Sequence, residues 1–215
     1  MSWSSGKDSA MALAEARADP TVTVTGLLTT VDADTGEVPI HGVPLELVRA
    51  QARSLGLPIR VVELPWPCPN DVYEDRITSA LADAAREGVT RLIFGDLHLS
   101  DIREYRERLL ANTALTPAFP LWGRDTAVLA GDIIRAGVCA VVTCVDTRTV
   151  PAAPVGRWFD HDLLSEFPPS VDPCGENGEF HTFVVDGPGF SQPVNIVPGA
   201  AAHRDGYAVL PLSAG

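Results

Sequence analysis

Largely apolar runs that alternate with amphipathic helical patterns constrain the fold of this 215-residue chain more than any other feature. Such runs, rich in β-branched residues, are typical of strands that are buried on both faces of a sheet. Because helices separate them, consecutive strands can run parallel. The predicted strands are 22–31, 57–64, 89–96 and 138–146, and the predicted helices are 44–56, 70–88, about 101–112 and 125–137.

The segment 70–88 is the clearest helix of the chain. Asn70 can cap its first turn, and Tyr73, Ile77 and Ala84 recur at helical spacing. We therefore expect the helix to begin with Asn70 as its N-cap and to bury one apolar stripe.

Polar clusters follow the expected strands at the end where ligands bind in parallel sheets. They are Ser4–Ser9, Thr29–Asp32, Gly95–Asp101 and Asp146. Four clusters that are distant in the sequence are thus predicted to converge on one rim of the sheet.

The pattern changes after about residue 147. Residues 147–175 are rich in proline and irregular, 179–187 alternate like a strand, and 194–212 can add two short strands. The sequence therefore predicts a parallel α/β domain over 1–146 and a smaller α+β subdomain over 147–215.

The stretch SSGKDS, residues 4–9, has the ingredients of a phosphate-binding loop. It is not a Walker A sequence. Its small residues nevertheless permit close backbone approach to an anion, and the following helix would direct its positive end at that anion. Lys7 is the only lysine among the sixteen basic residues of the chain. The alternative is a polar tail that leads into a helix.

Two further clusters contain candidate site residues. Arg103 and Arg106 share a helix face that suits an anion, although Arg103 and Glu107 also have the spacing of a surface ion pair. In CGENGEFHT, residues 174–182, glycines flank Glu176 and indicate backbone close to a ligand. Cys174, Glu176, Glu179 and His181 are potential metal ligands, but their spacing matches no standard metal site.

The composition argues against several classes of protein. A net charge of −12 disfavours a surface for nucleic acid. No apolar run is long enough to span a bilayer, and no signal peptide is evident. The four cysteines form no C-x-x-C pair, which predicts a reduced, cytoplasmic protein without a zinc or disulfide framework.

The loop and three later stretches resemble a known family. SSGKDS is similar to the SGGKDS loop of the PP-loop (N-type) ATP pyrophosphatases. The stretches FGDLHLSDIREYRERL (94–109), PLWGRD (120–125) and CGENGEFHTFVVDGPGF (174–190) resemble the diphthine–ammonia ligase branch, as do HGV (41–43) and QARSLGLP (51–58). Ser5 stands where the family has glycine, and CGENGEFHT replaces a typical GEGGEYET.

The resemblance implies a fold of the adenine-nucleotide alpha-hydrolase (HUP) type and an ATP-dependent ligase. A substrate carboxylate would attack the α-phosphorus of ATP, and ammonia would then displace AMP to give an amide. Loop amides, Lys7 and Mg²⁺ would compensate the charge of the departing pyrophosphate.

The resemblance also implies roles for individual residues. Catalysis would involve Lys7, Asp8, Glu176 and Glu179, with Mg²⁺ on Asp8. ATP would contact Ser4, Ser5, Gly6, Lys7, Asp8, Ser9, Thr29, Gly95 and Asp96. The substrate would contact Asp101, Arg103, Arg106, Glu176, Glu179 and His181. The expected partners are ATP, ammonium and a carboxylate-bearing substrate, which can be part of a protein, and the chain can form a homo-oligomer.

Two other functions stay open at this point. An RNA-thiolating enzyme of the same superfamily would want a reactive cysteine pair and a basic RNA-binding module, and neither is visible. A non-catalytic nucleotide sensor would explain the loop but not CGENGEFHT.

The position of the loop raises a question about its support. Only Met1–Trp3 precede it, whereas the family places a central strand there. We therefore expect a stub of that strand at Met1–Trp3 and further β-branched residues upstream of Met1 in the working protein.

Overall fold

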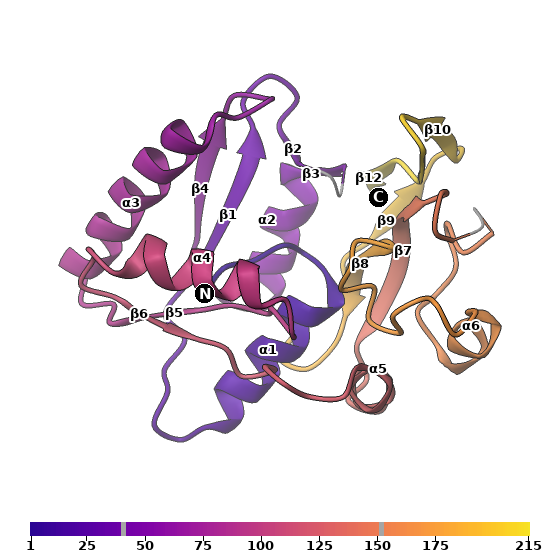
Figure 1. The fold of residues 1–215 in the computed structure, drawn as a ribbon, viewed down its shortest axis with the longest axis horizontal. Helices are drawn as coiled ribbons and strands as arrows, with labels where there is room; N and C mark the ends of the chain where they lie inside the picture. The colour runs from indigo at the N-terminus through magenta and orange to yellow at the C-terminus, as the bar shows by residue number, and fades with distance from the viewer. Residues whose placement is uncertain (40–41, 151–152) are drawn as a thin grey trace.

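The computed structural model describes residues 1–39, 42–150 and 153–215, so His41 of the HGV stretch lies outside the described residues. Two groups of elements lie side by side (Figure 1). The elements from α1 (Lys7–Ala18) to β6 (Thr116–Ala118) form the first group, and those from α5 (Thr126–Arg135) to the C-terminus form the second.

The first group contains three of the four predicted strands and one strand that was not predicted, β6, arranged as two parallel pairs. β1 (Leu27–Asp32) pairs in parallel with β4 (Ile59–Leu64), and β5 (Arg91–Ile93) pairs in parallel with β6. The predicted strand over 22–31 is thus shorter than expected and begins at Leu27. A mixed α/β architecture with parallel strands is confirmed for this part of the chain.

Met1–Trp3 join the two strand pairs. The Trp3 N–H donates to Leu28 O at 2.8 Å, and the Ser2 N–H donates to Ile93 O at 2.9 Å. Ser2 and Leu28 form a single parallel bridge. The expected stub is therefore present between β1 and β5, and it leads directly into the SSGKDS loop. The expectation of residues upstream of Met1 stays a prediction.

Helices cover these strands where the sequence predicts them. Besides α1, they are α2 (Leu45–Ser54), α3 (Asn70–Arg86) and α4 (Ser100–Leu110), and a short hairpin of β2 (Glu37–Val38) and β3 (Val43–Pro44) precedes α2. The cap predicted for α3 is wrong by one residue. Pro69 holds the N-cap position, and the Asn70 side chain instead donates to Glu74 at 2.7 Å.

The second group is built on antiparallel pairing. β7 (Cys139–Asp146) lies between β8 (Phe180–Asp186) and β11 (Tyr207–Val209), and β10 (Ala202–Arg204) completes that sheet. The expectation that 138–146 belongs to a parallel sheet is therefore wrong, because its partners come from the C-terminal part of the chain and run in the opposite direction. The domain boundary at 146 stays a prediction.

The segment after β7 is more structured than its composition suggests. Helix α6 (His161–Glu166) was not predicted, and Asp160 caps it by accepting the Leu163 N–H at 2.8 Å. The tail contributes four short strands instead of two, since β9 (Ile196–Pro198) also pairs with β12 (Leu212–Ala214).

The main hydrophobic core crosses from one group to the other. Buried side chains from α1, α2, β7 and β8 belong to one cluster, which includes Trp3, Leu13, Leu47, Val142 and Phe183. A second cluster packs α3 and α4 against β1, β4 and β5. Within the described ranges, no helix is long and apolar enough to cross a bilayer.

Candidate functional site

The SSGKDS loop is supported from the C-terminal half of the chain. The Ser5 carbonyl accepts the Val184 N–H of β8 at 3.0 Å and the Gln51 side-chain amide of α2 at 3.1 Å. Gln51 is fully buried, and it also donates to Val184 O and accepts the Trp3 indole N–H. Strand β8 and one glutamine therefore hold the loop together with the backbone contacts of Ser2 and Trp3.

The backbone of the loop bends sharply at Ser5. Its φ of 69° lies in the left-handed region, which glycine adopts at lower cost than serine. The Ser5 hydroxyl is buried and has no hydrogen-bond partner among the described residues. Ser5 thus shapes the loop, and its side chain does not reach the cavity described below.

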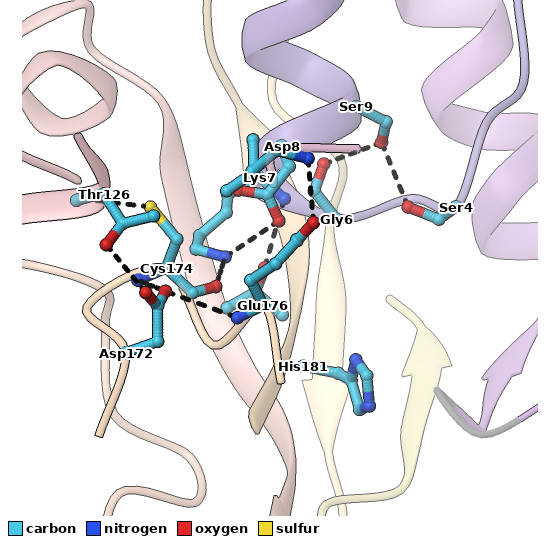
Figure 2. A network of polar contacts seen from close by, with 12 residues as sticks. Ser4, Gly6, Lys7, Asp8, Ser9, Thr126, Asp172, Cys174, Glu176 and His181 are labelled. Carbon is cyan, nitrogen blue, oxygen red and sulfur yellow. Dashed lines mark hydrogen bonds and ion pairs between the residues drawn. The ribbon is translucent and has the colours of Figure 1, made fainter. Parts of the chain in front are cut away.

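Helix α1 presents hydrogen-bond donors at its N-terminus. The Lys7 N–H donates to the Thr182 hydroxyl at 3.1 Å, whereas the N–H groups of Asp8 and Ser9 meet no acceptor within the described part of the chain. The Ser9 hydroxyl donates to Gly6 O at 2.8 Å, and Ser4 contacts Ser9 (Figure 2). The remaining donors and the helix dipole suit an anion.

Gly95, which follows β5, packs directly on this helix terminus. A Cβ atom at position 95 would lie 3.1 Å from the backbone N of Ser9 and from the carbonyl carbon of Asp8. Only glycine permits such an approach without displacing one of the two segments, and the predicted contact of Gly95 with ATP stays a prediction.

A cavity of about 250 Å³ opens in front of the loop. Residues from both halves of the chain line it, which places the predicted loop residues beside the predicted CGENGEFHT residues. The lining includes Ser4, Gly6, Lys7, Asp8, Ser9, Gly95, Asp96, Arg106, Cys174, Glu176, His181 and Thr182.

Glu176 is the carboxylate of the 172–179 loop that faces this cavity. Its Oε1 accepts the Leu97 N–H at 2.8 Å, which links the C-terminal half to the segment after β5. Burial raises the pKa of Glu176 to about 7, and the nearby carboxylates of Asp8 and Asp96 act in the same direction. A carboxyl group with this pKa can accept or release a proton near neutral pH.

Asp96 and Arg106 form an ion pair in the lining of the cavity, with Arg106 Nε 3.5 Å from Asp96 Oδ2. Burial raises the pKa of Asp96, although Arg106 opposes the shift. The guanidinium also lies 5.1 Å from the centroid of the Phe94 ring and donates to the Tyr73 hydroxyl at 3.3 Å. Arg106 therefore contributes positive charge to a cavity that is also lined by Lys7 and by the carboxylates of Asp8, Asp96 and Glu176.

A second cavity of about 520 Å³ adjoins the first. The two share Ser2, Ser4, Phe94 and Arg106 in their linings, and the second is lined largely by aromatic and aliphatic side chains. Thr29 also lines it, is 3% exposed, and has a hydroxyl without a partner among the described residues. Such an apolar cavity with a few polar groups is typical of a small-molecule site.

The 172–179 loop holds itself together with two acidic side chains. Glu179 accepts the N–H groups of Asp172 and Asn177 at 3.0 and 2.9 Å, and the Asn177 amide at 3.0 Å. Asp172 accepts the Cys174 N–H at 2.8 Å and the Thr126 hydroxyl at 2.7 Å. These contacts fix the loop against the start of α5.

Lys7 has an unexpected environment. Its side chain is 2% exposed, and its ammonium donates to Asp8 Oδ2 at 2.9 Å and to the Cys174 carbonyl (Figure 2). Burial on its own would lower the pKa of Lys7, but the attraction of Asp8 and other nearby acidic groups outweighs burial, and the pKa is raised. The predicted contact with phosphate stays a prediction, because two of the three ammonium N–H groups are already engaged.

Comparisons with known proteins identify the family. The diphthamide synthase N-terminal domain matches residues 1–116, and the diphthamide synthase C-terminal domain matches residues 125–209. The chain belongs to the diphthamide synthase family. A diphthine–ammonia ligase from Danio rerio is 32% identical over 106 residues, which are 46% of this chain and 41% of that protein. The match thus spans less than half of the relative.

The two domain matches of the diphthamide synthase family correspond to the two walls of the cavity. The SSGKDS loop, Gly95, Asp96 and Arg106 lie within the N-terminal match, and Glu176 and His181 lie within the C-terminal match. The predicted site residues that meet at the cavity therefore come from both domains of the family.

Four predicted site residues lie elsewhere, the first of which is Ser5, whose side chain lines neither cavity. Asp101 is exposed on the first turn of α4 and lines neither cavity. Arg103 forms an ion pair with Glu107 at 2.8 Å and stacks on Phe119 and Trp122. The surface ion pair, which was the alternative to an anion site, therefore describes its position. Glu179 is directed into its own loop, and its position favours a structural role over contact with substrate.

His181 lines the cavity, and its predicted contact with substrate stays a prediction. Burial lowers its pKa to about 4, and the positive charge of Lys7 acts in the same direction. The imidazole is therefore neutral at physiological pH, where it can exchange hydrogen bonds but does not carry charge.

Sequence reasoning missed the residues that position the site. Gln51, Asp172 and Thr182 are buried or half-buried and support the loops through hydrogen bonds to backbone. Gln51 and Thr182 fall within stretches that resemble the family, but no local pattern marks their roles. Gln51, a polar residue on the buried face of α2, was the one available signal.

Asp8 is the predicted ligand of Mg²⁺. Asp8 Oδ1 is buried without a hydrogen-bond partner in the described residues, which leaves one oxygen for a hard cation. Across those residues, no cluster of three His, Cys, Asp or Glu side chains could hold a metal ion. Asp8 therefore fits a Mg²⁺ ion that takes its other ligands from water and phosphate, and does not fit a resident ion held by protein alone.

Proposed function

We propose that this chain is an ATP-dependent ligase that adenylates a carboxylate and then amidates it with ammonia, releasing AMP and pyrophosphate. The Danio rerio relative is named for joining diphthine and ammonia. The observation that carries the proposal is the pair of adjoining cavities, one at a helix N-terminus and one lined by aromatic side chains. We also propose the PP-loop form of the HUP fold for the N-terminal half.

ATP would occupy both cavities. The nucleoside fits the larger, apolar cavity, where Thr29 offers an unpaired hydroxyl. The phosphates fit in front of α1, within reach of the N–H groups of Asp8 and Ser9 and the hydroxyl of Ser4. Arg106 lines both cavities, so its guanidinium would lie near the α-phosphate and offset the charge that develops there.

The proposed reaction has two steps, adenylation and amidation. A carboxylate oxygen of the substrate forms a bond to the α-phosphorus, and the bond from that phosphorus to the bridging oxygen of pyrophosphate breaks. Ammonia then bonds to the acyl carbon, and AMP leaves with the electrons of the acyl–oxygen bond. Glu176 takes the proton that the new amide nitrogen loses, which its pKa of about 7 permits. Mg²⁺ on Asp8 would offset phosphate charge when bound.

The other functions receive less support from the site. Burial raises the pKa of Cys174 to about 12 and that of Cys144 to about 11, so neither thiol suits the nucleophile of a thiolating enzyme. A nucleotide sensor would not need the Glu176 carboxyl beside the phosphate site. The acidic composition likewise argues against nucleic acid. A cytoplasmic location, supply of ammonia in free form or by a partner, and a homo-oligomer stay predictions.

The test is the product set. The protein, ATP, Mg²⁺ and ammonium are incubated with a panel of carboxylic acids, including carboxylated peptides, and nucleotides are separated by chromatography. We expect AMP and pyrophosphate in amounts that depend on the acid. Formation of ADP and orthophosphate would exclude adenylation, and binding of ATP without turnover of any acid would favour the sensor.

A further inference from the structure

The surroundings of Lys7 point to a role that phosphate binding does not explain. Lys7 begins α1 in the N-terminal half, but its ammonium lies among residues of the C-terminal half. It donates to the Cys174 carbonyl, and its Nζ lies 5.1 and 5.3 Å from the centroids of the Phe180 and Phe159 rings. Aromatic faces attract cations, so these three contacts hold the ammonium against the second half of the chain.

The contact with Cys174 bears on the position of Glu176. Cys174 is fixed on its other sides, because its N–H donates to Asp172 at 2.8 Å and its thiol contacts Thr126 O at 3.3 Å. Gly175 follows in the left-handed region, with a φ of 69°, and turns the chain toward Glu176. The carbonyl that Lys7 binds thus lies two residues before the side chain that faces the cavity, in a turn whose Gly175 and Glu176 N–H groups donate to Asp172.

A buried ammonium requires compensation, and Asp8 provides it at 2.9 Å. The same aspartate lines the cavity, and its second carboxylate oxygen is buried without a hydrogen-bond partner among the described residues. Lys7 and Asp8, adjacent in the sequence, thus divide two tasks. Asp8 borders the phosphate region, and Lys7 reaches across to the 172–179 loop.

We propose that Lys7 is a positioning residue whose ammonium binds the Cys174 carbonyl and so holds Glu176 over the cavity. This inference rests on the proposed ligase function for its effect on catalysis, but not for its effect on the loop. Arginine would not replace lysine here, since its planar fork is too large for the space between two aromatic rings and a carbonyl.

The test compares the wild type with Lys7→Met, which keeps the stem of the side chain but removes its donors and charge. Arg17→Met is the matched control, because Arg17 lies on the same helix and donates to a backbone carbonyl, Leu55 O, away from the cavity. Hydrogen exchange of the amides of Asp172, Cys174, Gly175 and Asn177, which are hydrogen-bonded within the loop, reports its stability without any activity assay.

We expect these amides to exchange roughly 10- to 150-fold faster in Lys7→Met, the factor for one lost charge-assisted hydrogen bond. ATP affinity should change less than about threefold, and kcat for amide formation should fall with loss of the pH limb that Glu176 provides. Unchanged exchange in the loop would overturn the proposal. So would a tenfold or larger loss of ATP affinity with the pH limb intact, which is the result for a phosphate ligand.

Two outcomes separate this proposal from the ligase function. A wild type that releases no AMP with any acid refutes the ligase function, while faster loop exchange in Lys7→Met still supports the contact. If Lys7→Met does not fold, hydrogen exchange is measured on Lys7→Gln, which retains an N–H donor but no charge. We expect its loop amides to exchange at a rate between that of the wild type and that expected for Lys7→Met.

Discussion

Residues 4–9 and residues 172–179 are both short, polar and rich in small residues, yet their polar groups find partners in different ways. The SSGKDS loop depends on distant elements, because its bend at Ser5 is held by Gln51 and Val184. The 172–179 loop supplies its own partners through Asp172 and Glu179. The first loop leaves backbone N–H groups facing the cavity, whereas the second leaves one carboxyl group facing it.

Two glutamates of the 172–179 loop have different roles although their local sequences are similar. Glu176 and Glu179 lie three positions apart, and each directly follows a glycine. The carboxylate of Glu179 accepts three hydrogen bonds from its own loop, whereas Glu176 is held by the Leu97 N–H at the edge of a cavity. Its hydrogen bonds thus give the Glu179 carboxylate a structural role, whereas the Glu176 carboxyl group can take part in proton transfer.

The largest effect is expected for Glu176→Gln, which removes the proposed base. We expect kcat for amide formation to fall by about 10²- to 10⁴-fold with ATP affinity nearly unchanged. In the wild type kcat should rise with pH through about 7, the pKa of Glu176, and this limb should be absent in the variant. The rates are measured at constant free ammonia, with the surface variant Glu104→Gln as control. The same pH profile in the wild type and in Glu176→Gln would mean that another residue is the base.

The same substitution should affect stability in a pH-dependent way. Burial raises the pKa of Glu176 from 4.5 to about 7, so the folded chain binds more protons than the unfolded chain between these values. The wild type therefore loses stability from this group as pH rises through that window. Relative to the wild type, Glu176→Gln should gain melting temperature between pH 5 and pH 8, and a constant difference would contradict the raised pKa.

Gln51→Leu tests whether the SSGKDS loop depends on distant support. Leucine leaves the Trp3 N–H and the Ser5 and Val184 carbonyls with fewer partners in a buried region. We expect a loss of about 2–5 kcal/mol in the free energy of unfolding, together with weaker ATP binding in the folded fraction. Urea titration and calorimetry measure the two effects. The exposed Gln192→Leu is the control, and equal stability of both variants would mean that β8 alone holds the loop.

Glu179→Gln tests the self-supporting loop. A glutamine keeps one acceptor oxygen but presents an amide N–H₂ to backbone N–H groups, so some of the three hydrogen bonds must be lost. The expected cost is about 1–3 kcal/mol at pH 8. At that pH Glu176→Gln should be stabilised relative to the wild type, so thermal melts of the two variants should shift in opposite directions. Shifts of the same sign would remove the distinction between the two glutamates.

The smallest effect is expected for Ser5→Gly. Glycine relieves the cost of a left-handed serine and removes a buried hydroxyl without a partner, whereas its greater freedom in the unfolded chain acts against this gain. We expect a net stabilisation of about 1 kcal/mol and unchanged ATP affinity. A clear loss of stability would show that the serine hydroxyl forms a contact in solution.

The sequence by itself determined the local features of this protein. The sequence pattern predicted the helices α2 to α5 and the strands β1, β4 and β5 within a few residues, because burial of one face or of both faces dictates such patterns, and the loop predicted that α1 follows it. Small residues before a helix predicted the SSGKDS loop, and glycine spacing predicted that Glu176 lies near a ligand site. Each of these depends on interactions between neighbours in the chain.

Only the tertiary structure decided how these features are combined. The pairing of β7 with β8 and β11, the support of Ser5 by Gln51, and the contact of Lys7 with Cys174 join residues that lie between 35 and 167 positions apart. Local patterns specify which groups are buried and polar but not which partners satisfy them. That choice arises when two distant segments are packed together and every buried donor must find an acceptor.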